Sequence, residues 1–188
     1  MERAYNPPRK YEEHSYVLDF NTRGKSTTVR GREGIIVTAI GEDRLTLLEI
    51  LGQPNSTFEV GEKIFIGKEG RTKVLSVLGK MTYDRISSSA QTELSGVVEK
   101  IVIENEKRFI DYLNNAQSLT PRIHALELIP GIGKTYMRLM LEEREKKKFE
   151  NFVDLQERIG FKEPVKQISK RIMEEITGET RMNLFVKR

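Results

Sequence analysis

The segment Pro130-Gly131-Ile132-Gly133-Lys134 constrains the fold of this 188-residue chain more than any other. Proline disfavours the α conformation at the residue before it, so Pro130 ends any helix that runs into this segment. The two glycines supply backbone freedom and lack the Cβ atoms that would keep another chain at a distance. Ile132 stands between them and can anchor the turn in a core. An amphipathic segment starts at once with Lys134, so the pattern predicts a very tight turn between two helices.

The turn is also expected to attract anions. It opens into a helix N-terminus, where unpaired N–H groups and the positive end of the helix dipole favour negative charge. The side chain of Lys134 adds a full positive charge beside them. The sequence therefore predicts a phosphate site lined by the backbone of Gly131, Ile132, Gly133 and Lys134.

A nucleotide-binding P-loop is the alternative reading of these residues, because Gly133-Lys134-Thr135 matches its last positions. The P-loop requires a glycine five residues before Gly133, and that position is Leu128. The apolar residues before the turn are spaced for a helix rather than a buried strand: Ile123, Leu126 and Ile129. We therefore expect no ATP or GTP binding here.

The segment instead resembles the helix-hairpin-helix motif, in which a Gly-apolar-Gly turn joins two helices. Met137 occupies the position four residues after the last glycine, where the family more often has alanine, and it keeps the apolar character of that position. The resemblance implies contact with the sugar-phosphate backbone of nucleic acid through the turn amides, without reading of sequence. A purely structural helical hairpin that binds nothing remains the alternative.

A second, weaker copy follows along the chain. A short amphipathic helix is predicted for residues 152–159, a turn for residues 160–164 and a longer helix for residues 165–177, ended by Gly178. A Gly-x-Gly hairpin followed by a degenerate partner is typical of tandem helix-hairpin-helix domains, in which both hairpins grip phosphates across a groove.

The second turn has lost one glycine. If Gly160 is aligned with Gly131, then Lys162 stands where Gly133 stands in the first turn. Close backbone approach is therefore less favourable in this copy, although the side chains of Lys162 and Lys166 can reach phosphates. We expect Gly160, Lys162 and Lys166 to form this second contact.

The N-terminal half reads as a small β-barrel. Five short β-rich segments follow one another with glycine-marked turns and no helix between them: Tyr16–Phe20, Ile35–Ile40, Arg44–Ile50, Val60–Ile66 and Lys73–Leu78. An OB-like fold fits the number of strands, and other small barrels fit nearly as well. A polar loop is expected between the first two strands, over residues 21–32. Its basic side chains are candidate nucleic-acid contacts or simply solvated: Arg23, Lys25, Arg30 and Arg32.

Helical segments follow the barrel. Two connecting helices are predicted over residues 90–102 and 106–114, the first capped by the serines at 87–89. Thr120 followed by Pro121 is typical of a cap and first helical position, so the next helix is expected to begin there. The fold class is thus α+β, with an OB-like β-barrel followed by an all-α domain. Its expected divisions are a mobile arm (1–13), a barrel (14–86), connecting helices (87–117), a tandem helix-hairpin-helix domain (118–180) and a tail (181–188).

Composition narrows the functional classes. The formal net charge of +4 and the sequence pI near 9.2 favour a polyanionic partner. The absence of cysteine excludes disulfide-linked partners and thiolate metal sites. No apolar run approaches the ~20 residues of a membrane span, and the N-terminus lacks the apolar segment of a signal peptide. We expect a cytoplasmic protein with no membrane partner.

No catalytic constellation, metal site or cofactor is expected. The two histidines are His14 and His124, and His124 is predicted to be a packed or capping side chain. The acidic residues are mostly interleaved with lysine and arginine, as on ordinary solvated helices. Two alternatives to a non-enzymatic nucleic-acid binder stay open: a protein-interaction adaptor, and an enzyme whose site is not recognisable from the sequence.

Nearly the whole chain is similar to an uncharacterised archaeal family that joins an OB-like barrel to a C-terminal tandem helix-hairpin-helix domain. The segments that carry the similarity are His124–Lys134 and Asp154–Gly160. The resemblance implies nucleic-acid binding and no established activity. An OB-like barrel joined to a module that grips the backbone favours RNA slightly over DNA, and a larger protein or ribonucleoprotein assembly is a further expected partner.

Overall fold

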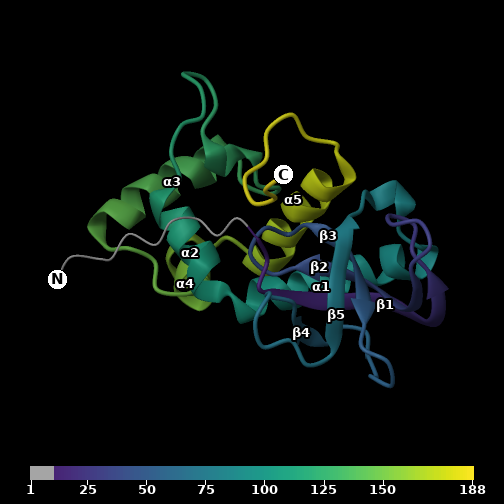
Figure 1. Ribbon diagram of the computed structural model, residues 1–188. Helices are drawn as coiled ribbons and strands as arrows, with labels where there is room; N and C mark the ends of the chain where they lie inside the picture. The colour runs from purple at the N-terminus through teal and green to yellow at the C-terminus, as the bar shows by residue number, and fades with distance from the viewer. Residues whose placement is uncertain (1–10) are drawn as a thin grey trace. The chain divides into compact units, whose positions relative to one another are not determined.

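The computed structural model describes residues 11–188 (Figure 1). The chain divides into two compact units. The first contains the residues through Glu93 together with Lys187–Arg188, and the second contains Leu94–Val186. The first ten residues of the predicted mobile arm (1–13) lie outside the described residues.

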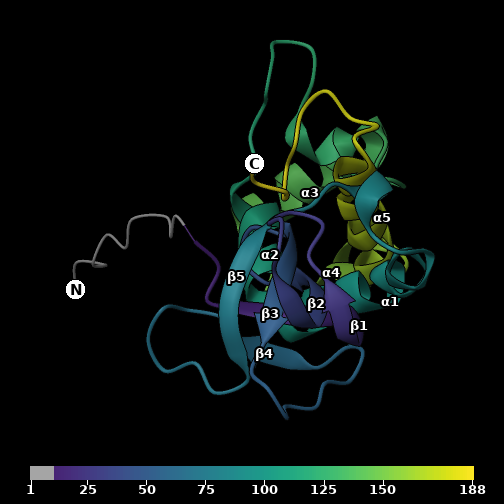
Figure 2. The ribbon, with the colours of Figure 1, turned by 45° about the vertical axis from the view of Figure 1, so that its right-hand side comes forward.

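The first unit is a curled, five-stranded antiparallel half-barrel, which places the protein in the predicted α+β class (Figure 2). The strand order across the sheet is β4-β1-β2-β3-β5. The strands are β1 (His14–Lys25), β2 (Glu33–Gly41), β3 (Leu47–Gly52), β4 (Lys63–Phe65) and β5 (Val74–Lys80). Each of the five predicted strand segments therefore contains or overlaps an observed strand. The curl encloses an apolar core of Val17, Val37, Ala39, Leu48, Ile50, Phe58, Ile64, Ile66 and Val74.

Strand β1 is longer than predicted. The prediction of a polar loop over residues 21–32 was wrong for residues 21–25. Strand β1 continues through a bulge there and pairs Gly24 with Gly34 and Lys25 with Glu33. The extension carries mostly exposed polar side chains, so it has no apolar alternation that would mark it as a strand. Gly24 is required there, since a Cβ atom would lie 2.9 Å from Cγ1 of Ile36.

A buried carboxylate shapes the loop that follows β1. Glu49 on β3 is 2% exposed and accepts a hydrogen bond from the hydroxyl of Ser26. It also accepts bonds from the backbone N–H and hydroxyl of Thr27, at 3.0 and 2.8 Å, and from the hydroxyl of Thr28 at 2.7 Å. Burial raises the pKa of Glu49, but the bonds from Ser26, Thr28 and Thr27 outweigh it and lower the pKa below its usual 4.5. The loop is thus folded over an ionised side chain.

A second buried carboxylate fixes the chain just before β1. Glu12 accepts hydrogen bonds from the backbone N–H groups of Asp43 (2.9 Å) and Arg44 (2.7 Å). Burial raises the pKa of Glu12 despite these bonds. A Cβ atom at Gly41 would overlap the carboxylate of Glu12 at 2.1 Å, so this glycine makes room for it. The sequence placed Glu12 in the arm, whereas the structure attaches it to the β2–β3 turn.

The helices are α1 (Ser88–Glu104), α2 (Glu106–Asn115), α3 (Lys134–Lys146), α4 (Phe152–Ile159) and α5 (Pro164–Thr177), with short 3-10 turns η1 (Tyr83–Arg85) and η2 (Ala125–Leu128). The predicted N-cap of the first helix is confirmed, since the hydroxyl of Ser87 accepts from the N–H of Ala90 at 3.1 Å. Within residues 11–188, no helix has both the length and the apolar character of a membrane span.

The helix predicted to begin at Thr120 and Pro121 was wrong. The hydroxyl of Thr120 accepts from the backbone N–H of Ile123 at 3.0 Å and closes a local turn there instead of capping a helix. The chain then forms only the 3-10 turn η2, capped by Nδ1 of His124, which accepts from the N–H of Leu126 at 3.1 Å. The capping role predicted for His124 is confirmed.

The C-terminal segment is docked without forming a strand. The buried carboxylate of Glu175 accepts from the backbone N–H groups of Leu184, Phe185 and Val186, each at 2.9 Å. It also pairs with Nε of Arg171 at 2.9 Å. The sequence left a docking strand or a free tail open, and the structure shows the segment through Val186 held by this carboxylate within the second unit.

Candidate phosphate-binding site

The first turn, residues 129–134, has the geometry that its sequence predicts. The backbone N–H of Ile132 donates to the carbonyl of Ile129 at 3.0 Å, which leaves Pro130 and Gly131 at the two central positions. Gly131 has φ = +82°, and proline followed by a residue with positive φ is the pairing of a type II turn. Ile132 is 3% exposed, so its side chain anchors the turn as expected.

Gly131 is required for two separate structural reasons. Its φ lies in the left-handed region that favours glycine. A Cβ atom there would also lie 3.2 Å from Cε2 of Phe161 and 3.3 Å from Cδ of Gln167. The glycine therefore allows the first turn to pack closely against the second one.

Neither a positive φ nor a crowded Cβ position explains the glycine at position 133. It adopts φ = −87° and ψ = −174°, a conformation open to other residues. Apart from its neighbours along the chain, no heavy atom lies within 4 Å of the position that its Cβ would occupy. The missing side chain leaves an open approach to the backbone at the start of α3.

The start of α3 has no side-chain cap. Gly133 is its N-cap residue, and its carbonyl accepts the first helical bond from the N–H of Met137 at 2.9 Å. No side-chain bond caps this end of α3 in the described chain, so the amides of Lys134, Thr135 and Tyr136 are left for a ligand or solvent. Lys134 and Thr135 are exposed. The N-terminus of α3 thus combines open space, unpaired amides and a lysine.

The second turn, residues 159–164, is one residue longer between its glycine and its helix. Gly160 ends α4 with φ = +76°, and the buried Phe161 anchors this turn. The N-cap of α5 is Glu163, with φ = +53° and no side-chain cap. Glu163, and not Lys162, therefore holds the position that corresponds to Gly133, which corrects the alignment expected from the sequence.

The second turn offers a weaker anion site for this reason. Pro164 at the first helical position has no N–H to donate. The carboxylate of Glu163 adds a negative charge at the N-cap. The cations of this turn are Lys162 and Lys166, both exposed. Its contribution would come mainly from these two side chains.

The predicted site residues of both turns are brought together in the second unit. The ring of Tyr136 on α3 meets that of Phe161 edge-on, with centroids 5.8 Å apart. The Tyr136 hydroxyl lies 3.5 Å from the carbonyl of Gly160, to which it donates. Together with the contact between Gly131 and Phe161, this places the two turns side by side.

The sequence did not predict a network of hydrogen bonds that supports α3. The guanidinium of Arg158 on α4 donates to the carbonyls of Glu143 and Lys147, each at 2.7 Å, at the C-terminal end of α3. The amide of Asn114 on α2 exchanges two 2.9 Å hydrogen bonds with the backbone of Phe149. Both side chains bond to backbone far away in sequence, so no local pattern marks them. They hold α3 in place between its neighbours.

The basic residues proposed for the barrel lie at one end of β1 and in the loop after it. Arg23, Lys25, Arg30 and Arg32 are exposed. Lys25 pairs with Glu33 at 3.8 Å, with both side chains mostly in solvent. This group belongs to the first unit, whereas the two turns belong to the second. Among residues 11–188, no group of three or more His, Asp or Glu is arranged to hold a metal ion.

Comparison with known proteins places the chain among archaeal relatives. A profile of the family described as "protein of unknown function (DUF655)" matches residues 11–187. The uncharacterized protein MJ0038 of Methanocaldococcus jannaschii is 40% identical over 184 residues, which cover 97% of this chain and 83% of the relative. The crystal structure of Af1531 from Archaeoglobus fulgidus, described with the same family, matches with a TM-score of 0.82 at 36% identity, and covers 94% of this chain and 100% of that chain.

Proposed function

We propose that this chain, which belongs to the DUF655 family, is a non-enzymatic nucleic-acid-binding protein that grips the sugar-phosphate backbone. In this proposal the second unit contains a tandem helix-hairpin-helix. Its first hairpin consists of η2, the first turn and α3, and its second hairpin consists of α4, the second turn and α5. The half-barrel is an OB-like module that adds further contacts. Binding is largely independent of sequence, with RNA slightly favoured over DNA.

The observation that carries the proposal is the glycine at position 133. A glycine is usually explained by a positive φ or by a neighbour that leaves no room for Cβ, and Gly133 has neither. Close approach of a ligand to the backbone is a further physical reason for a residue without a side chain, and it applies here because Gly133 stands at the uncapped start of α3. The ligand is anionic, because it meets the N-terminal amides of α3 and the ammonium of Lys134.

Contacts of this kind explain why binding would not depend on sequence. Backbone amides and lysine side chains recognise phosphate oxygens, which are the same at every nucleotide. The first turn would hold one phosphate through the open amides at the start of α3 and through Lys134, whereas the predicted contact from the amide of Ile132 is not available because that N–H bonds to the carbonyl of Ile129. The neighbouring second turn would hold another through Lys162 and Lys166, with Gly160 allowing the chain to reverse between α4 and α5.

Fluorescence anisotropy with labelled single-stranded RNA, duplex RNA and duplex DNA tests the proposal. Each ligand is titrated over a salt series with the wild type and with Lys134→Glu. Lys107→Glu on α2 is the matched control, because Lys107 is an exposed lysine of the same unit. We expect Lys134→Glu to weaken binding about tenfold or more and to reduce the salt dependence by about one phosphate contact.

The outcomes separate the candidate functions. Equal losses in Lys134→Glu and Lys107→Glu would mean that only net charge matters and that the first turn holds no phosphate. Absence of binding at low salt would leave the turns as structural elements. The adaptor alternative would then be favoured, in which a different face contacts a protein or ribonucleoprotein assembly.

A further inference from the structure

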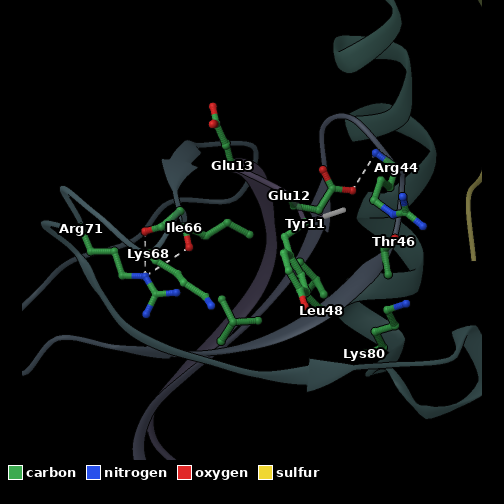
Figure 3. A pocket seen from close by; sticks show the side chains of 12 residues that line it. Tyr11, Glu12, Glu13, Arg44, Thr46, Leu48, Ile66, Lys68, Arg71 and Lys80 are labelled. Carbon is green, nitrogen blue, oxygen red and sulfur yellow. Dashed lines mark hydrogen bonds between the residues drawn. The ribbon is translucent and has the colours of Figure 1, made fainter. Parts of the chain in front are cut away.

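The first unit carries a cavity that the proposed phosphate site does not use. It has a volume of about 620 Å³ and lies between the two edge regions of the half-barrel (Figure 3). One wall comes from β5 and the other from the residues that follow β4. Its floor is apolar and contains Leu48, Ile66 and Val77. Its size and apolar floor are those of a small-ligand pocket.

Cations stand at both ends of this cavity. In Figure 3, Lys68 and Arg71 lie at one end, Arg44 and Lys80 lie at the other, and Leu48 lies between the two pairs. The guanidinium of Arg71 is fixed by Nε, which donates to the carbonyls of Ile66 and Gly67 at 3.1 and 2.9 Å. The lining includes two carboxylates, Glu12 and Glu13, against these four cations. The cavity therefore suits a ligand that is apolar in the middle and anionic at both ends.

An exposed aromatic ring stands beside the apolar floor. Tyr11 is 66% exposed, and Nζ of Lys68 lies 5.6 Å from the centroid of its ring. The next residue, Glu12, is anchored to the backbone of the β2–β3 turn, which holds the Tyr11 ring at the cavity. Tyr11 and Leu48 line the same cavity (Figure 3). Exposed aromatic rings beside cationic grooves stack nucleic-acid bases.

We propose that this cavity takes one nucleotide of a single-stranded nucleic acid. The base rests on the apolar floor and against Tyr11, and the phosphates on its two sides meet the two pairs of cations. A duplex does not enter, because its bases are already stacked and paired. This inference rests on the proposed function and adds to it a preference of the first unit for unpaired strands.

Photo-cross-linking and anisotropy together test this inference. A single-stranded oligonucleotide with 5-iodouridine is irradiated with the full-length protein, and the cross-linked peptides are identified by mass spectrometry. In parallel, affinities for single-stranded and duplex RNA are measured for wild type, Tyr11→Ala, Tyr11→Phe and Lys80→Gln. Tyr11→Phe is the matched control, because it keeps the aromatic ring.

We expect a cross-link at Tyr11. Tyr11→Ala should weaken single-strand binding at least about fivefold, with duplex binding changed less than about twofold. Lys80→Gln should likewise weaken binding of single-stranded RNA more than binding of duplex RNA. Tyr11→Phe should bind both as the wild type does.

Cross-links confined to the peptide with Gly131–Lys134, with single-strand affinity unchanged in Tyr11→Ala, would overturn the cavity site and leave the proposed function intact. Absence of binding by either RNA would overturn both. If a polyglutamate peptide binds and loses affinity in Tyr11→Ala while the oligonucleotide does not, the occupant is an acidic peptide and the inference is wrong.

Discussion

Gly131 and Phe161 form the contact that joins the two turns. A Cβ atom at Gly131 would lie 3.2 Å from Cε2 of Phe161, so the backbone of the first turn packs directly on a buried ring of the second. The two residues are thirty positions apart in the sequence. The contact therefore depends on the folded unit, and it sets the spacing between the two proposed phosphate contacts.

Gly131→Ala is expected to destabilise the second unit. The substitution forces a side chain into a left-handed conformation and crowds Phe161, which together should cost about 1–2 kcal/mol. Thermal or urea unfolding measures the loss. Gly96→Ala on α1 is the control: its Cβ meets open space, so it should stabilise by about 0.5–1 kcal/mol. Equal stability of Gly131→Ala and wild type would contradict the packing argument.

Gly133→Asn is expected to separate stability from binding. Asparagine is a better N-cap than glycine by a few tenths of a kcal/mol, and the site has room for its side chain, so stability should be equal or slightly higher. Its amide oxygen would accept from the first-turn N–H groups of α3 and occupy the proposed phosphate position. Nucleic-acid affinity measured by anisotropy should fall roughly tenfold, in line with the loss of a charge-assisted contact. Unchanged affinity would show that the ligand does not approach here.

Local features of the fold could be predicted from the sequence. The turn at Pro130–Gly133, the start of α3 at Lys134 and the stop at Gly178 follow from residues that act on their own backbone. The apolar stripe of α1 was likewise found by its helical spacing, and its residues from Ala90 to Val102 include a buried face. Within the candidate site, the same local chemistry identified Gly131, Gly133 and Lys134.

Features that depend on distant partners could not be predicted. The hydroxyl of Thr120 had two available roles, and the local turn prevailed over a helix cap. The role of Glu175 as the anchor of the C-terminal segment requires three amides from residues 184–186. The cavity beside Tyr11 is assembled from segments spread between residues 11 and 80. No local pattern specifies such arrangements.

Glu175→Gln is expected to destabilise the second unit strongly. Arg171 is 6% exposed, and the substitution removes the closer of the two carboxylates that pair with its guanidinium, at 2.9 Å compared with 3.8 Å for Glu174. The new amide N–H₂ would also face backbone donors from the C-terminal segment. Breaking a buried pair in this way costs about 3–5 kcal/mol. Thermal unfolding compared with the wild type measures the effect, and a loss below about 1 kcal/mol would show that the pair contributes little.

The loop after β1 is expected to loosen in acid. The folded-state pKa of Glu49 lies below its ordinary 4.5, so its contribution to stability is present above that value and is lost as the pH falls through the folded-state pKa. Glu49→Gln should remove this part of the acid dependence while lowering stability at neutral pH. Unfolding midpoints of wild type and Glu49→Gln, measured from pH 7 downward, should converge in acid. Parallel curves would contradict the assignment.

The most direct test of phosphate capture is an NMR titration of the ¹⁵N-labelled full chain with a short RNA. If the first turn holds a phosphate, the amide signals of Gly133, Lys134, Thr135 and Tyr136 should show the largest shifts, and Gly133→Asn should suppress them. Large shifts elsewhere, with these four amides unchanged at saturation, would contradict the central claim that the open backbone at the start of α3 binds the nucleic-acid phosphate.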